Sequence, residues 1–321
     1  MARPSLVLVT PALAAANNGN WQTARRWASM LAADYRVRVQ LHWDGEPADA
    51  MIALHARRSA DDVAAWHARH PGQPLVLALT GTDLYRDIAV DATAQRSLDC
   101  ADRLVVLNER GPLMLPQPLR AKAVVCLQSS PTRRALPKTT RLLRALMVGH
   151  LRDEKRPQTY FAAARRLAGR CDILLDHIGG SLEPALGQAA TALQREQPRY
   201  RWLGALDHMT TRRRIQQAHV LVHCSAMEGG AQVIIEAVAC GTPVLASRID
   251  GNLGLLGDDY AGCFDLGDDA ALASLLQRCR DDPAWLPRLH AQCAARAPLF
   301  EPAHERHVLR TLMSDLLESR P

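Results

Sequence analysis

The chain has 321 residues, of which 48% are hydrophobic, so it is long enough for two domains that each bury a core of their own. Its net charge of +6 is carried mostly by arginine, which suits anionic ligands, although a coding bias toward Ala and Arg explains most of it. The low aromatic content (4%) argues against a stacking platform for single-stranded nucleic acid, and no block of like charge indicates a nucleic-acid or membrane surface.

The first apolar run follows Arg3 and loosely resembles a secretory signal. Thr10-Pro11 interrupts it, so we expect a first strand and its loop rather than an export signal. No other segment approaches the ~20 apolar residues of a membrane span. The eight cysteines are scattered, without a C-x-x-C pair or zinc spacing, and are expected to be reduced thiols. These features predict a cytoplasmic protein without stable membrane association.

Short apolar runs alternate with longer amphipathic segments, the pattern of doubly wound parallel sheets. In the first half the expected strands are Leu6–Val9, Val37–Leu41, Met51–Leu54, Leu75–Leu79, Leu104–Leu107 and Val124–Leu127. In the second half they are Ala145–Val148, Ile173–Ile178, Tyr200–Leu203, Val220–Cys224 and Val244–Ala246. The two series predict an α/β chain with Rossmann-like domains at residues 1–130 and 144–300, a linker at 131–143 and a final helix within 301–321.

The loop after the first strand precedes a helix that we expect to begin near Trp21. Gly19 and Asn20 can present backbone N–H groups and the positive end of the helix dipole to a diphosphate or to an acceptor, and Asn18 lies next to them. A merely structural turn explains these residues nearly as well.

Two groups of polar residues end the third and fourth expected strands. His55, Arg57 and Arg58 follow one strand, and Thr80 and Asp83 follow the other. Ligands of such folds bind at the carboxyl ends of the strands, so these residues are candidates for holding an acceptor. Asp83 either orients a hydroxyl or caps a helix, and capping is the simpler explanation.

The second half opens with a charged loop that follows a strand, Gly149-His150-Leu151-Arg152-Asp153-Glu154-Lys155. Cations at such a place would stabilise negative charge that develops on a leaving group. The alternative is a solvated surface turn. Two later loops, Gly179-Gly180 and Gly204-Ala205-Leu206, also follow expected strands.

The most informative stretch runs from Met227 to Ser247. It places Glu228, the pair Gly229-Gly230 and then Glu236, eight residues after the first carboxylate, on a turn that leads into a short helix. Two glycines at a helix start let phosphate approach bare N–H groups, and carboxylates accept hydrogen bonds from sugar or ribose hydroxyls. By spacing alone, a surface turn explains the stretch equally well.

Together with the Gly241-Thr242-Pro243-Val244 run behind it, this stretch resembles the Glu-x7-Glu signature of the GT-B glycosyltransferases of family 4. The resemblance implies two Rossmann-like domains that face each other across a cleft, and a C-terminal helix that crosses back to the first domain. It also implies a UDP-sugar as co-substrate, with no metal and no cofactor. In the family pattern an Arg and a Lys of the charged loop neutralise the leaving diphosphate. Lys155 matches that Lys, His150 stands at the usual Arg, and Arg152 lies two positions later.

The resemblance thereby assigns a role to each candidate. Arg152, Lys155 and Glu228 are expected to be catalytic. Glu228 would hold the sugar and Glu236 the ribose hydroxyls. The full donor-binding set is Gly19, Asn20, His150, Arg152, Lys155, Gly180, Leu206, Glu228, Gly229, Gly230 and Glu236. The acceptor-binding set is Asn18, His55, Arg57, Arg58, Thr80 and Asp83.

Several first-domain stretches, among them Pro11–Trp21, His55–Arg58 and Thr80–Asp87, resemble the selenosugar synthases of selenoneine biosynthesis. Those enzymes couple a UDP-sugar, typically UDP-N-acetylglucosamine, to selenophosphate. Such an acceptor is a small anion and already a strong nucleophile, so it needs a cationic pocket rather than a strong base. The alternatives are an O-glycosyltransferase acting on a glycan, lipid or small molecule, a UDP-sugar epimerase, and a non-catalytic UDP-sugar-binding protein. No nucleic-acid partner is expected, and the oligomeric state stays open.

Overall fold

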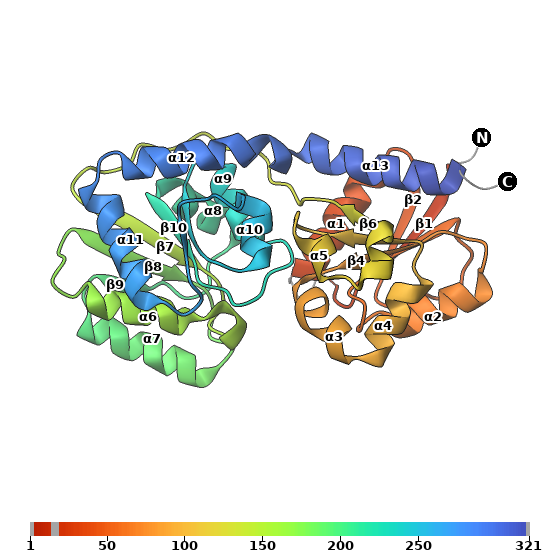
Figure 1. The fold of residues 1–321 in the computed structure, drawn as a ribbon, viewed down its shortest axis with the longest axis horizontal. Helices are drawn as coiled ribbons and strands as arrows, with labels where there is room; N and C mark the ends of the chain where they lie inside the picture. Colours follow the sequence, from red (N-terminus) through yellow and green to blue (C-terminus); the bar gives the residue numbers. More distant parts are fainter. Residues whose placement is uncertain (1–2, 14–18, 319–321) are drawn as a thin grey trace. The chain divides into compact units, whose positions relative to one another are not determined.

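The computed structural model describes residues 3–13 and 19–318, which form two compact units (Figure 1). Unit 1 comprises Met1–Gln128, Glu228–Gly230 and Pro302–Pro321. Unit 2 comprises Ser129–Met227 and Ala231–Glu301. Each unit contains a six-stranded sheet in which all neighbouring strands are parallel.

The sheet of unit 1 has the strand order β2-β1-β3-β4-β5-β6. Its strands are β1 (Ser5–Val9), β2 (Arg36–Gln40), β3 (Ala50–Leu54), β4 (Leu75–Leu79), β5 (Arg103–Val106) and β6 (Ala123–Val125). The helices are α1 (Gly19–Leu31), α2 (Ala60–Arg69), η2 (Asp83–Asp87), α3 (Ile88–Val90), α4 (Ala92–Cys100), α5 (Gly111–Met114), η3 (Gln117–Lys122) and α13 (Pro302–Glu318). The helix α1 thus begins two residues before Trp21.

Both faces of the inner strands of this sheet are buried, which is why β1, β3 and β4 are continuous apolar runs, whereas the edge strand β2 alternates Arg and Val. On one face Leu8 and Ile52 pack with Trp27 of α1 and Met313 of α13. The opposite face packs against α2 and α4, where Trp66 belongs to the core (Figure 1). Parallel neighbouring strands need a crossover connection, and α1, α2 and α4 provide such connections in this sheet.

The sheet of unit 2 has the strand order β12-β11-β10-β7-β8-β9. Its strands are β7 (Leu143–Val148), β8 (Ile173–Ile178), β9 (Tyr200–Trp202), β10 (Val220–His223), β11 (Val244–Ser247) and β12 (Cys263–Phe264). The helices are η4 (Asp153–Lys155), α6 (Pro157–Arg166), α7 (Pro184–Glu196), α8 (His208–Gln217), α9 (Gln232–Val238), α10 (Asp250–Leu256), α11 (Asp269–Asp281), α12 (Trp285–Arg296) and η5 (Ala297–Phe300). Figure 1 shows α6 and α7 on one face of the sheet and α8 and α9 on the other.

The strand order reverses once in each sheet, between β1 and β3 in unit 1 and between β7 and β10 in unit 2. Open α/β sheets bind their ligands outside the carboxyl ends of the strands at such a reversal. The loops after β1 and β3, and those after β7 and β10, are therefore the places to look for a site. These loops contain most of the residues that the sequence singled out.

The two parallel sheets with flanking helices confirm the expected α/β class with two Rossmann-like units. Each strand predicted from the sequence is present, and β12 (Cys263–Phe264) is an additional short edge strand. The segment 129–142 has no regular helix or strand and belongs to unit 2. Within the described residues, no helix is both long and apolar enough to cross a membrane.

Candidate functional sites

The charged loop after β7 folds tightly over its own first residue. A Cβ added to Gly149 would lie 3.5 Å from Cγ and Cδ of Lys155, so the aliphatic part of that lysine packs over the glycine. The turn η4 carries Lys155, and Arg156 ends it in the left-handed conformation (φ 45°). This compact turn keeps Arg152 and Lys155 at the carboxyl end of β7.

The imidazole of His150 connects this loop to the next one. Its Nδ1 accepts a hydrogen bond from the Gly180 N–H at 3.0 Å. Partial burial lowers the pKa of His150, and the neighbouring charges of Arg152 and Lys155 lower it further. A neutral imidazole whose Nδ1 is an acceptor carries its hydrogen on Nε2. His150 therefore supplies a neutral donor where the family resemblance implies a cationic arginine.

Gly179 brings the loops after β7 and β8 into contact. A Cβ at this position would lie 1.9 Å from the carbonyl oxygen of Gly149, which no side chain tolerates. The Gly179 N–H donates to Gly204 O at 2.8 Å, and Trp202 Nε1 donates to Gly179 O at 2.8 Å. The loop after β8, which contains Gly180, is thus hydrogen-bonded to the loop after β7 and to the loop after β9. Leu206 lies half-buried in the loop after β9.

A buried histidine also contacts the loop after β7. His177 on β8 contacts Gly149 O through Nε2 and Tyr200 OH through Nδ1, each at 3.1 Å. Burial lowers the pKa of His177 to about 4, so the ring is neutral at physiological pH. It acts as a brace for the loops.

Glu236 lies on α9 and its side chain is buried. Its Oε1 is 2.7 Å from Nε2 of His208, the exposed first residue of α8. This hydrogen bond raises the pKa of His208. The carboxylate expected to hold ribose hydroxyls is thus already engaged by an imidazole. His208 is not among the candidates that the sequence indicated, because its only signal there is a polar side chain shortly after the Gly204–Leu206 loop.

The segment Glu228–Gly230 belongs to unit 1 and approaches its backbone closely. A Cβ on Gly229 would lie 2.6 Å from the carbonyl carbon of Thr80, and one on Gly230 would lie 2.9 Å from Cβ of Leu107. Asn108 Nδ2 donates to Gly229 O at 2.7 Å. Here the glycines are required by packing, besides any role near phosphate. Asn108 was not selected either, although a polar residue just after a strand could have been.

His55 occupies a strained position at the carboxyl end of β3. Its φ of 75° lies in the left-handed region, which costs a non-glycine residue about 1 kcal/mol or more. The ring is buried, its Nε2 is 3.1 Å from Thr82 Oγ1, and Asp83 and Asp87 lie within 4.0 Å. Burial lowers the pKa of His55 against the opposing effect of the two carboxylates. The structure thus puts His55 in the interior of the loop rather than on its surface.

Asp83 is fully buried and connects the ends of two strands. One carboxylate oxygen accepts from Ala56 N at 2.9 Å, and the other accepts from Thr80 N and Thr80 Oγ1 at 2.8 Å each. The expected choice was between a ligand for a hydroxyl and a helix cap. The carboxylate is not a helix cap, because the strand-end loops use its hydrogen-bonding capacity. Its expected contact with the acceptor stays a prediction.

Three guanidinium groups, those of Arg57, Arg58 and Arg86, are exposed near this strand end. Arg57 Nε forms an ion pair with Asp87 at 2.8 Å, and Arg86 Nε contacts the other oxygen of that carboxylate at 3.0 Å. Arg58 is exposed and has no ion-pair partner in the part of the chain that is described. Of the acceptor candidates, Arg57 and Arg58 are therefore the cations that an anion could reach.

The remaining candidates lie at the start of α1. Gly19 and Asn20 form its first turn, and Gly19 O accepts from Thr23 Oγ1 at 2.9 Å. Asn18 lies outside the described residues. Among residues 3–13 and 19–318, no group of three or more His, Cys, Asp or Glu residues is arranged to hold a metal ion.

Comparisons with known proteins agree with this architecture. In sequence, a D-inositol 3-phosphate glycosyltransferase of Nocardiopsis dassonvillei is 33% identical over 176 residues, which are 48% of this chain and 38% of that protein. One of Frankia alni is 38% identical over 96 residues, 29% of this chain and 24% of that protein. The chain therefore aligns with well under half the length of these curated relatives.

In structure, sucrose-phosphate synthase of Thermosynechococcus elongatus superposes with a TM-score of 0.79 at 18% identity, covering 99% of this chain and all of that one. Anabaena HepE in complex with UDP and glucose gives a TM-score of 0.78 at 15% identity, covering 98% and 100%. At such low identity these likenesses show the GT-B fold alone. The sequence profile of the glycosyl transferases group 1 matches residues 129–298, more than half of the chain. The chain belongs to the glycosyl transferases group 1 family.

Proposed function

We propose that this protein transfers a sugar from a UDP-sugar to a small anionic acceptor. The observation that carries the proposal is the loop after β7, where His150, Arg152 and Lys155 are gathered at the strand end where such sheets bind ligands. Family membership supports the reaction class. The complex of HepE with UDP and glucose supports a uridine diphosphate donor.

In this proposal unit 2 holds the donor. Lys155 and Arg152 stabilise the negative charge that develops on the leaving diphosphate, and His150 donates from Nε2. Glu236 accepts hydrogen bonds from the ribose hydroxyls. The His208 ring either leaves Glu236 Oε1 when the donor binds or keeps its hydrogen bond to that oxygen while the hydroxyls use the rest of the carboxylate. Gly180 and Leu206 lie against the base. The expected donor contacts of Glu228, Gly229, Gly230, Gly19 and Asn20 rest on the family resemblance alone, since these residues belong to unit 1. No metal is required, because fixed cations replace it.

For the acceptor we propose selenophosphate, with N-acetylglucosamine as the transferred sugar. Selenium attacks the anomeric carbon, a carbon–selenium bond forms, and the bond from that carbon to the diphosphate oxygen breaks with its electron pair leaving on UDP. The nucleophile is already ionised, so no protein base is needed. The exposed guanidiniums of Arg57 and Arg58 support an anionic acceptor at the end of β3. His55, Thr80 and Asp83 would position that loop.

A second candidate is a hydroxyl acceptor that carries a phosphate group. It is favoured by the curated relatives, which are named as D-inositol 3-phosphate glycosyltransferases. Both acceptors are phosphate-bearing anions, so both suit the same arginines. They differ in the atom that attacks: a hydroxyl oxygen must lose a proton, whereas selenophosphate need not.

The test is an anaerobic incubation with UDP-N-acetylglucosamine, with selenophosphate, with inositol 3-phosphate, or with neither, read by mass spectrometry. A hexosamine-sized product with the selenium isotope pattern, and UDP released only with selenophosphate, is the expected result. Product only with inositol 3-phosphate would select the second candidate. UDP release that ignores both acceptors would point to hydrolysis or another acceptor, and no turnover with any UDP-sugar would leave a sugar-nucleotide-binding protein.

The acceptor assignment has its own variants. Arg58→Ala and Arg57→Ala should each raise the KM for selenophosphate at least tenfold, the order expected for one charge-assisted contact, and leave the KM for the UDP-sugar nearly unchanged. Equal effects on both constants would rule out these arginines as acceptor ligands without touching the donor assignment.

A further inference from the structure

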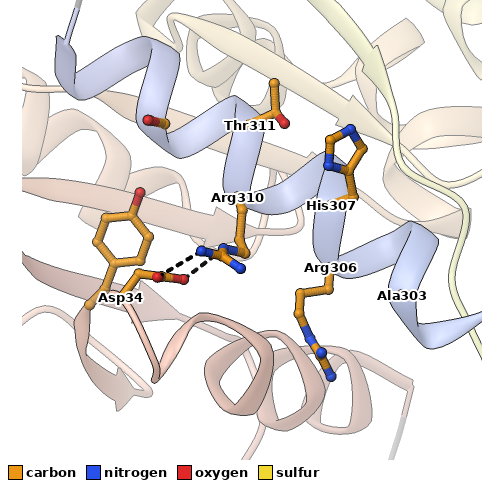
Figure 2. Close-up of a pocket in the computed structure, with 8 residues that line it drawn as sticks. Asp34, Ala303, Arg306, His307, Arg310 and Thr311 are labelled. Carbon is orange, nitrogen blue, oxygen red and sulfur yellow. Dashed lines mark hydrogen bonds and ion pairs between the residues drawn. The ribbon is translucent and has the colours of Figure 1, made fainter.

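A second candidate site lies in unit 1, on residues that belong to neither the donor nor the acceptor candidates. An open cavity of about 490 Å³ forms between α13 and the turn that follows α1 (Figure 2). Its lining residues are Asp34, Tyr35, Ala303, Arg306, His307, Arg310, Thr311 and Ser314. A space of this volume is large enough for a sugar phosphate or a nucleotide.

The position of the cavity separates it from the acceptor candidates. Asp34 and Tyr35 immediately precede β2, so they lie at the amino end of a parallel strand. The loops that contain Gly19, His55–Arg58 and Thr80–Asp83 follow strands of the same sheet and lie at the carboxyl ends. The two groups thus lie at opposite ends of the parallel strands of one sheet. A ligand in the cavity is not the reacting acceptor.

The charge of the lining is positive. Arg310 is held by Asp34, with Nε 2.7 Å from Oδ2 and Nη2 donating to Oδ1 at 2.9 Å, so its guanidinium is fixed in place (Figure 2). Asp34 is the one carboxylate among the lining residues. In the described part of the chain, Arg306 and His307 have no ion-pair partner. The charge of Arg310 is therefore neutralised by Asp34, whereas the charge of Arg306 is not paired with any described residue.

The basic residues are also arranged to act together. Arg306 and Arg310 are four positions apart, so their side chains share one side of α13, as Figure 2 shows. Three residues that carry hydroxyl groups, Tyr35, Thr311 and Ser314, also line the cavity. The Ser314 hydroxyl donates to Glu318 Oε1 at 2.6 Å, so it is already used within the protein. Guanidinium and hydroxyl donors around one concave space are the chemistry that binds phosphate oxygens.

We propose that this cavity binds a phosphorylated small molecule, with Arg306 as the main contact for the phosphate and Arg310 and Thr311 as further donors. A ligand there would contact α13 and the Asp34-Tyr35 turn at once. It would stabilise the attachment of the C-terminal helix to unit 1, because a ligand that binds only the folded state adds to stability. The shared chemistry is a phosphate group, on a free metabolite or on a lipid headgroup.

The test uses the full chain and inorganic pyrophosphate as probe, titrated by calorimetry with UDP present in excess so that the proposed donor site is filled. Wild-type protein should bind pyrophosphate and show a raised Tm. Arg306→Glu should weaken binding by about tenfold or more, since one charge-assisted contact is lost and a repulsive one is added. The matched control is Arg96→Glu, an equal charge change at an exposed residue of α4 in the same unit.

Each outcome decides the matter. Loss of binding in Arg306→Glu but not in Arg96→Glu supports the site. No pyrophosphate binding by wild-type protein, or equal losses in both variants, overturns it. If vesicles containing an anionic phospholipid bind with the same dependence on Arg306 and pyrophosphate competes with them, the phosphate belongs to a headgroup. Lys155→Ala separates this from the proposed function, because it should weaken UDP binding and leave pyrophosphate binding in the cavity unchanged.

Discussion

The strand-end loops of the two units use the same kinds of residue in opposite ways. In unit 2 the side chains of His150 and Arg152 are exposed, while the close contact of Gly179 with Gly149 and the buried ring of His177 hold their loop in place. In unit 1 the side chains of His55 and Asp83 are buried and hold the loop themselves.

A polar residue at a strand end can therefore serve to hold its loop, and its place in the sequence does not show whether it also contacts a ligand. Where backbone glycines make the loop compact, side chains are left for a ligand. Where side chains make the loop compact, as with Asp83 and its three hydrogen bonds, the side chains left exposed are those of Arg57 and Arg58, for which we propose the acceptor contact. Substitution of the exposed side chains in the loop after β7 should therefore lower activity, and substitution of Asp83 or His55 should lower the stability of the fold.

The largest effect is expected at Lys155. Lys155→Ala should lower kcat/KM for the UDP-sugar by about 10²- to 10³-fold, the usual effect of removing one fixed stabiliser of developing charge. Circular dichroism should show the same Tm as wild type. Arg165→Ala is the control, because Arg165 is an exposed residue of α6 in the same unit. A drop in Tm large enough to explain the lost activity would mean that Lys155 has a structural role, as His55 and Asp83 have in unit 1.

Asp83 tests the other half of the comparison. Asp83→Ala removes the acceptor of two backbone N–H groups and one hydroxyl in the interior. It should lower the free energy of unfolding by about 3 kcal/mol, since each unsatisfied buried group costs about 1–3 kcal/mol. Urea denaturation measures it. Asp99→Ala, at an exposed position of α4, should change stability by less than about 0.5 kcal/mol. Similar values for the two variants would contradict the bracing role.

Gly229 tests whether the glycine pair serves packing. In Gly229→Ala the new Cβ would lie 2.6 Å from backbone atoms of Thr80, which cannot move aside as a side chain can. We expect a loss of about 1–3 kcal/mol, typical of overpacking, and faster amide exchange in Glu228–Gly230. Gly72→Ala adds the same methyl group where nothing lies within 4 Å and should be nearly neutral. If exchange in the segment stays as in wild type, the close approach to Thr80 does not hold it.

The smallest effect concerns His208 and depends on pH. Its pKa is raised in the folded state by the hydrogen bond to Glu236, so the pair adds stability below the unfolded pKa of about 6.5 and loses it as pH rises through the folded pKa. His208 is largely exposed, so the contribution stays below about 1 kcal/mol. His208→Ala should therefore be less stable than wild type at about pH 5.5 and equal to it at about pH 9. A difference that grows with pH would mean that another interaction dominates.

The sequence predicted the fold well because apolar runs buried on both faces are its plainest signal. The strands at Leu75–Leu79 and Val220–His223 needed no tertiary information. The clustering of His150 with Gly180 was not predictable, because it depends on how Gly179 passes the carbonyl of Gly149. The pairing of His208 with Glu236, 28 residues apart, likewise depends on how α8 packs near α9.

The burial of His55 and Asp83 could not be inferred from the sequence for the same reason. A histidine after a strand has the same sequence signature whether its ring faces solvent or the interior. Only the backbone decides, and the positive φ of His55 turns its ring inward against Thr82. The charge of Arg57 was visible in the sequence, but its partner Asp87, thirty residues away, was not.

The most direct test of this account is a calorimetric titration of UDP into wild-type protein and into Lys155→Ala, Glu236→Gln and Arg57→Ala. Unit 2 as the donor site predicts one UDP per chain, binding weakened about tenfold or more by the first two variants, and no change in Arg57→Ala. Absence of UDP binding, or weakening by Arg57→Ala as large as by Lys155→Ala, would contradict it.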